Sequence, residues 1–198
     1  MTAVAENIID APSELEVEVQ ELIDHTTAYA RAVVAGEIVT GELVRLACER
    51  HLRDLETAAE RNLWFKVEAA EATIAFFPEY LSHTKGRWAG QPFNLEPWEQ
   101  FCIGSVFGWK RLYSKCPACG SWEAAASEGQ IWCHNCHPVE EIYNEPAETK
   151  WLRRFRTSYK EVARKNGKTE VAAGVSLRML AFDDEYGAEV YTAATKAD

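Results

Sequence analysis

Two pairs of cysteines stand in the middle of the sequence, and each pair has two residues between its members. They are Cys116 with Cys119, and Cys133 with Cys136. A CxxC turn directs two thiolates at one point, and two such turns complete the tetrahedron that Zn²⁺ prefers. The pattern predicts a structural Zn²⁺ site with four sulfur ligands, in which His134 or His137 could replace one sulfur. A pair of redox dithiols is the alternative, although nothing thioredoxin-like accompanies these cysteines.

A second stretch with ligand-binding chemistry runs from Arg164 to Thr169 and reads RKNGKT. Where such a stretch joins a strand to a helix, backbone N–H groups of the turn converge on one point and bind an anion. Lys168 would then reach the β- and γ-phosphates of a nucleotide, and the Thr169 hydroxyl would ligate Mg²⁺. The usual pattern GxxxxGK[ST] has Gly at its first position, where this chain has Val162. The alternative is an ordinary helix start with solvated basic residues.

The elements that would hold these residues follow from hydrophobic periodicity. In the first expected helix, over 41–61, an apolar stripe lies opposite Arg50, Arg53 and Asp54. The stripe consists of Val44, Cys48, Leu52, Leu55 and Ala59. A second helix is expected over 67–81, where Pro78 would kink or divide it.

Pro97 would open a third helix, because its missing N–H costs nothing at that position. Further along, we expect a strand at 156–163, a helix from Lys168 to about Ala181 and a second strand at 189–194. In the helix, Val171, Val175 and Met179 share one face.

The composition narrows the class of protein. The chain has 198 residues, 47% hydrophobic and 26% charged, and a net charge of −10, which is ordinary for a globular protein and argues against a surface coated in nucleic acid. No apolar run is long enough to span a bilayer, so we expect a soluble protein without a membrane partner. Residues 1–26 form an acidic leader, and Cys48 and Cys102 are expected to be small buried hydrophobes.

Several segments together resemble the large terminase subunit of tailed bacteriophages. Residues 155–169 (FRTSYKEVARKNGKT) are similar to its ATPase motif, a deviant Walker A of the form RKNGK[ST]. Further similarity lies in 88–100 (WAGQPFNLEPWEQ), 107–110 (FGWK) and 47–52 (ACERHL). Terminases package viral DNA into a preformed capsid, with an N-terminal ATPase and a C-terminal nuclease.

The resemblance implies roles for individual residues. It makes ATP and Mg²⁺ the cofactors, with Lys168 and Arg164 acting on the phosphates, Arg164 as the residue that senses or stabilises the γ-phosphate. Gln100 would contact adenine. The implied nucleotide-binding residues are Gln100, Arg164, Lys165, Asn166, Gly167, Lys168 and Thr169. Its partners would be double-stranded viral DNA, the portal protein, the small terminase subunit and further copies in a ring, in the host cytoplasm.

The predicted fold class is α/β: N-terminal helices followed by the start of a P-loop NTPase core with a parallel sheet, carrying a small zinc-ribbon insertion. The expected divisions are 1–26 (leader), 27–111 (helical part), 112–150 (insertion) and 151–198 (start of the core). Because the sequence shows no Walker B acid and no nuclease carboxylates, we expect an incomplete core and negligible ATP hydrolysis by this chain alone. The alternative function is a non-enzymatic zinc-ribbon module that binds nucleic acid or a protein.

Overall fold

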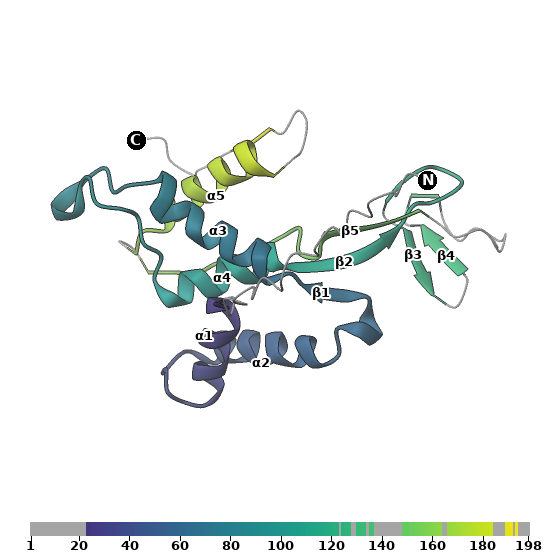
Figure 1. The fold of residues 1–198 in the computed structure, drawn as a ribbon, viewed down its shortest axis with the longest axis horizontal. Coiled ribbons are helices and arrows are strands. Elements are labelled where there is room, and N and C mark those ends of the chain that lie inside the picture. The colour runs from purple at the N-terminus through teal and green to yellow at the C-terminus, as the bar shows by residue number, and fades with distance from the viewer. Residues whose placement is uncertain are drawn as a thin grey trace, which may run out of the picture.

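A computed structural model describes residues 23–122, 124–127, 130–133, 135–136, 148–163, 166–183, 189–191 and 193. Most of the acidic leader thus lies outside the described residues. The helices gather at one end of the molecule, and a strand pair runs from them to a small hairpin at the other end (Figure 1). The helices are α1 (His25–Val34), α2 (Glu42–Glu56), α3 (Val67–Tyr80), α4 (Pro97–Gly108) and α5 (Lys168–Phe182), with short 3₁₀ turns η1 (Ala59–Arg61) and η2 (Gly86–Trp88).

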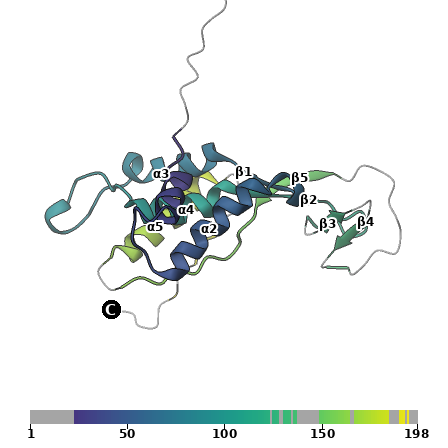
Figure 2. The same ribbon diagram turned by 90° about the horizontal axis from the view of Figure 1, so that it is seen from below.

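The strands form an antiparallel sheet. They are β1 (Leu63–Phe65), β2 (Trp109–Ser114), β3 (Ala124–Ser127), β4 (Gln130–Cys133) and β5 (Thr149–Arg153). The central strand β2 pairs with β1 on one edge and with β5 on the other, and its last residue, Ser114, pairs with Ala124 of β3. Seen from below, the loop that carries η2 and the β3–β4 hairpin project from opposite ends of the molecule (Figure 2).

The helices begin and end largely where their sequences dictate. Pro97 is the first residue of α4, as predicted, and the Glu99 carboxylate accepts a hydrogen bond from the Glu96 N–H at 3.0 Å, which satisfies one free donor of the helix start. Of the two predicted effects of Pro78, division of the helix is wrong, because α3 runs on to Tyr80. Pro78 lies in the last turn, where only a short stretch of helix remains to be disturbed.

The main hydrophobic core joins α3, α4 and α5. Its buried members are Ile74, Phe76, Phe77, Phe93, Leu95, Ile103, Phe107 and Val171. The predicted face of α5 is confirmed, since Val171 is buried in this cluster and Val175 and Met179 pack against it. Between them, Gly174 lets α5 approach α3 so closely that a Cβ atom there would lie 2.4 Å from Phe77 Cε1.

The strands differ from those expected. The described pairings are all antiparallel, so a parallel sheet is not seen in this part of the chain. Residues 156–163 form no strand; the strand here is β5, which lies earlier at 149–153. Both edges of β2 are already paired, so the later segment finds no partner strand there. Residues 189–191, which begin the second expected strand, are not in a strand either.

No helix among the described residues is long and apolar enough to cross a membrane.

Candidate functional site

The GKT stretch lies at the start of α5. Gly167 has φ +64°, a left-handed conformation that Gly adopts without strain, and the helix begins with the next residue, Lys168. No side chain of the described residues caps this helix start, and the Val171 N–H returns to the Gly167 carbonyl at 2.9 Å. The Lys168 Nζ lies 3.5 Å from the Val162 carbonyl oxygen. The turn is therefore bent rather than extended, and the free N–H groups of the first helical turn point out of the helix.

The other predicted phosphate-binding residues lie around this turn. Asn166 precedes Gly167 in a bend, and Thr169 is exposed in the first turn of α5. Arg164 and Lys165 fall outside the described residues.

A pocket of about 670 Å³ adjoins the segment that leads to the turn. Tyr159, Lys160, Glu161 and Val162 form one wall, and the start of α4 with the α1–α2 connection forms the other. The Lys160 ammonium lies 4.4 Å from the ring centroid of Trp98 on α4, a cation–π contact that ties the segment to the helix. This volume and mostly apolar lining are typical of small-ligand sites.

Gln100, the predicted adenine contact, lies elsewhere on α4. Its Nε2 donates to the Leu95 carbonyl at 2.9 Å, and it lines a separate pocket of about 470 Å³ together with Glu68 and Glu71. The structure thus brings Trp98, rather than Gln100, into contact with the segment that precedes the turn.

The four predicted metal ligands come together at the far end of β2. Their sulfur atoms all lie within 4.8 Å of one another, with Cys116 Sγ 3.5 Å from Cys136 Sγ and Cys119 Sγ 3.6 Å from Cys133 Sγ. Sulfurs bound to one tetrahedral Zn²⁺ at about 2.3 Å stand slightly less than 4 Å apart, so the four thiols fit this ion. Gly120 (φ +72°) closes the first turn, where its N–H donates to the Cys116 carbonyl.

The electrostatics of the thiols reflect this crowding. Hydrogen bonds from backbone N–H groups, chiefly that of Cys119, lower the pKa of the Cys116 thiol to about 7. Hydrogen bonds with the other thiols, chiefly that of Cys116, raise the pKa of the Cys136 thiol to about 12. Neighbouring thiolates repel each other, so a cation is required to hold all four sulfurs ionised together.

Comparison with protein families adds to this geometry. Residues 148–198 match the family model of the terminase large subunit, ATPase domain. The matched residues include β5, the segment that leads to the turn, the turn itself and α5. The match supports a terminase-like ATP-binding role. No curated protein and no solved structure matched the chain.

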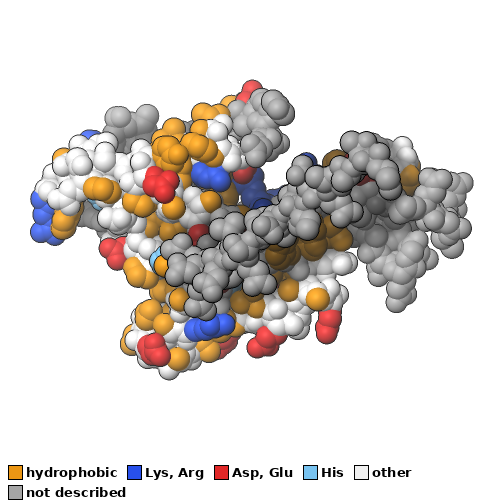
Figure 3. Space-filling model, in the orientation of Figure 1, with side chains coloured by type: hydrophobic (Ala, Val, Ile, Leu, Met, Phe, Trp, Pro, Cys, Tyr) orange, Lys and Arg blue, Asp and Glu red, His pale blue; other side chains and the backbone are white. Residues whose placement is uncertain are grey.

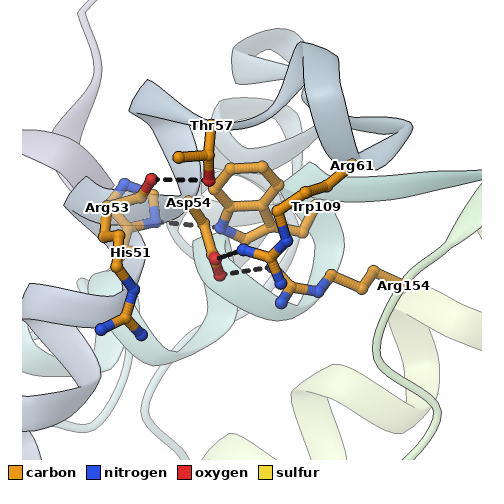
Figure 4. Close-up of polar contacts among 7 residues, drawn as sticks. All are labelled: His51, Arg53, Asp54, Thr57, Arg61, Trp109 and Arg154. Carbon is orange, nitrogen blue, oxygen red and sulfur yellow. Dashed lines mark hydrogen bonds and ion pairs between the residues drawn. The ribbon is translucent and has the colours of Figure 1, made fainter.

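A buried carboxylate anchors the start of the terminase-like segment to the helices (Figure 4). Asp54 of α2 has a side chain that is 1% exposed and accepts hydrogen bonds from Arg154, directly after β5, and from Arg61 of η1. Burial by itself would raise the pKa of Asp54, but the hydrogen bonds from Arg154 and Arg61 outweigh it and lower the pKa. The sequence predicted Asp54 on the side of the helix opposite the apolar stripe, where it would be exposed. This was wrong, because Arg61 and Arg154, which lie outside α2, cover the carboxylate and pair with it.

Next to Asp54 and its two arginines, His51 of α2 is buried where α1, α2 and β2 meet (Figure 4). The Trp109 Nε1–H of β2 donates to His51 Nδ1 at 3.0 Å, so the other ring nitrogen, Nε2, carries the proton and donates to Thr27 Oγ1, also at 3.0 Å. Burial lowers the pKa of His51 to about 4. A neutral histidine with both nitrogens bonded thus joins α1, α2 and β2.

Sequence reasoning missed His51, Asp54 and Arg154 as a unit. The one local signal was the spacing of His51 and Asp54, three residues apart on the same side of a helix. Their partners are 58 and 100 residues away in the sequence, a separation that periodicity cannot bridge.

Proposed function

We propose that this chain is the ATP-binding part of a phage DNA-packaging motor, a terminase large subunit that couples ATP hydrolysis to translocation of viral DNA into the capsid. The supporting observation is the coincidence of the family match over 148–198 with an uncapped α5 start at Lys168, after a left-handed Gly167. A helix start with free N–H groups and a positive dipole end attracts phosphate.

In this proposal each residue of the turn has a definite task. Lys168 and the N–H groups from Asn166 to Thr169 hold the β- and γ-phosphates, and the Thr169 hydroxyl is a Mg²⁺ ligand. Lys168 must leave the Val162 carbonyl, which it approaches only at 3.5 Å, to reach the phosphates. Arg164 stabilises the γ-phosphate and Lys165 adds to the positive field.

The base would lie in the pocket between Trp98 and the segment 159–162. The indole of Trp98 offers an apolar surface, and the pocket is continuous with the chain that enters the turn. Gln100 remains the alternative adenine contact, but its amide N–H already donates to Leu95. A base that depends on Gln100 would have to displace that hydrogen bond.

The remaining parts of the proposal concern the wider assembly. The division into leader, helical part, cysteine insertion and start of the ATPase core is retained, and the four cysteines hold a structural Zn²⁺. Double-stranded viral DNA, the portal protein, the small terminase subunit and further copies of the chain in a ring are the proposed partners. Multiple-turnover hydrolysis requires a Walker B acid, so we propose that this chain alone hydrolyses ATP negligibly.

A fluorescent ATP analogue tests the nucleotide site. We expect the analogue to bind the full chain in the presence of Mg²⁺, and Lys168→Ala to weaken binding by at least tenfold, because it removes the charge at the phosphates. Lys150→Ala, which removes an exposed basic residue from β5, is the matched control and should bind as the wild type does. Equal binding by wild type and Lys168→Ala would contradict the proposal and favour a basic patch. We expect no phosphate release over many turnovers. If the wild type released phosphate in this way and Lys168→Ala abolished the release, the expected inactivity would be contradicted.

A further inference from the structure

One face of the sheet carries a row of basic side chains next to α5. Trp64 of β1, Lys110 of β2 and Arg153 of β5 are directly opposite one another in the register, so they point to the same side. Lys66, two residues after Trp64, lies over the Trp64 ring with its ammonium 5.6 Å from the centroid. In Figure 3, Lys and Arg side chains are visible deep in the hollow between the α5 side of the molecule and the strands.

Four cations and one carboxylate lie close enough to influence one another in this recess, so its charges are unbalanced. They are Lys66, Lys110, Arg153, Arg178 and Asp183. Arg153 pairs with Asp183 at 2.6 Å, and Arg178 donates to the Phe182 carbonyl at the end of α5, so both have structural roles. Within the described part of the chain, no carboxylate lies within ion-pair distance of Lys66 or Lys110.

The position of Lys110 is unfavourable for the fold itself. Cations directly opposite each other on neighbouring strands destabilise a sheet, and Lys110 faces Arg153. Burial and the neighbouring cations, first Arg153, lower the pKa of Lys110. A bound anion would relieve this repulsion, whereas replacement of Lys110 by a neutral residue would relieve it without a ligand. The Lys110 ammonium, with Arg153 opposite it and no carboxylate of the described residues within ion-pair distance, is therefore placed to bind an anion.

The rim of the recess indicates the class of anion. Trp64 and Trp151 are 43% and 40% exposed and meet edge to face, with ring centroids 5.7 Å apart. Exposed indoles beside lysines are typical of nucleic-acid surfaces, where cations contact backbone phosphates and aromatic rings contact sugars or bases. The whole chain has a net charge of −10, so this cluster of cations is a local region of positive charge on an acidic protein.

We propose that the recess between β1–β2–β5 and the end of α5 binds the phosphodiester backbone of a nucleic acid through Lys66 and Lys110. The site is separate from the GKT turn. This inference rests on the proposed function in one respect, the choice of DNA as the nucleic acid to test.

Fluorescence anisotropy of the full chain with labelled DNA tests the site, using a short duplex and the corresponding single strand. We expect the double variant Lys66→Gln, Lys110→Gln to weaken binding to at least one of them by about tenfold or more. The slope of log affinity against log salt should become shallower by about two, because two phosphate contacts are lost. Whichever DNA, duplex or single strand, loses more affinity in the double variant is the form whose phosphates the recess binds.

The chain offers a matched control at its opposite end. Lys85→Gln, Arg87→Gln removes the same charge from the exposed η2 loop, where Arg87 lies over the half-exposed Trp88. An equal loss in that variant would show an effect of net charge and overturn the proposal, as would unchanged affinity in the recess variant. Lys110→Arg, which keeps the charge, should bind DNA as the wild type does; binding as weak as that of Lys110→Gln would also overturn it.

Two further measurements separate this site from the nucleotide site. Lys168→Ala should retain DNA binding, and the recess variant should retain binding of the ATP analogue. Failure of the ATP experiment alone would thus leave the recess intact. The melting temperature of Lys110→Gln should equal or exceed that of the wild type, because a facing cation is removed; a lower melting temperature would contradict the argument from repulsion.

Discussion

The two ends of β2 are stabilised in opposite ways. At its start, Trp109 is 1% exposed and bonded to His51, and the nearby Asp54 has two arginine partners from the same chain. At its far end, four thiols crowd together, and among the described residues their partners are one another and backbone N–H groups. His51, Trp109 and Asp54 of the helical end thus have partners within the protein, whereas the four thiols of the cysteine end are arranged as a metal ion would need them. We therefore expect the two ends to respond independently to different perturbations.

The largest expected effect sharpens this contrast at the cysteine end. Replacement of Cys116 and Cys133 by Ser should abolish zinc binding, because it removes two of the four sulfur ligands. The effect is expected to be large, since structural Zn²⁺ contributes about 10 kcal/mol or more to the folding of zinc-finger peptides. Zinc content measured by elemental analysis checks this, and circular dichroism should show the helices retained. Cys48→Ser, which alters a buried thiol of the helical end, should leave the zinc content unchanged. Loss of helix on removal of zinc would show that the two ends are not independent.

The next effect lies at the helical end. Asp54→Ala should lower the free energy of unfolding by about 3–5 kcal/mol, because it leaves Arg154 and Arg61 without their buried partner. Urea denaturation followed by tryptophan fluorescence measures it. Glu49→Ala, which removes the exposed partner of Arg45 on the same helix, should cost less than about 1 kcal/mol. Similar losses in both variants would refute the role given to the buried carboxylate.

His51 makes the helical end sensitive to acid. Its pKa is about 4 in the folded protein and 6.5 when exposed, so the unfolded chain binds the proton more readily. Stability from this group is complete above pH 6.5 and falls as the pH drops towards 4, by about 3 kcal/mol in all. Unfolding measured across this range in wild type and His51→Gln tests the effect, since the variant should lack this part of the pH dependence. An identical pH dependence in both proteins would contradict it.

The smallest effect concerns the packing of α5. Gly174→Ala should destabilise the protein by about 1–3 kcal/mol, because the new Cβ would meet Phe77 and Leu81. Ala173→Ser, on the exposed side of α5, should change stability by less than about 0.5 kcal/mol. Thermal unfolding compares the two, and a neutral Gly174→Ala would mean that α5 can move away from α3.

The sequence allowed correct prediction of features that depend on neighbours along the chain. The start of α4 at Pro97, the buried stripe of α5 and the approach of the four cysteines all follow from local spacing. The strands were misplaced because a strand is defined by its partner. The pairing of β5 with β2 joins residues some 40 positions apart, such as Lys110 and Arg153, and nothing local distinguishes 149–153 from 156–163.

The same limit applies to the candidate site. Gly167 and Lys168 were predicted from the GKT pattern, and the resemblance covers the region that the family model matches. The contact of Lys160 with Trp98 and the pairing of Arg154 with Asp54 depend on tertiary packing and were not foreseen. Basic residues before the turn looked alike in sequence, and only the structure separates Arg154, which pairs with the buried Asp54, from the exposed Lys150 and Arg156.

The ladder between β2 and β5 has a mechanical consequence. Its five residue pairs, from Lys110–Arg153 to Ser114–Thr149, lie side by side along the direction that joins the cysteine end to the helices. Tension along that direction is carried along the backbones of both strands, which the ladder holds together. A partner that pulls on the cysteine end would therefore transmit its force to Trp109 and Arg154, and through Arg154 to the segment that enters the GKT turn.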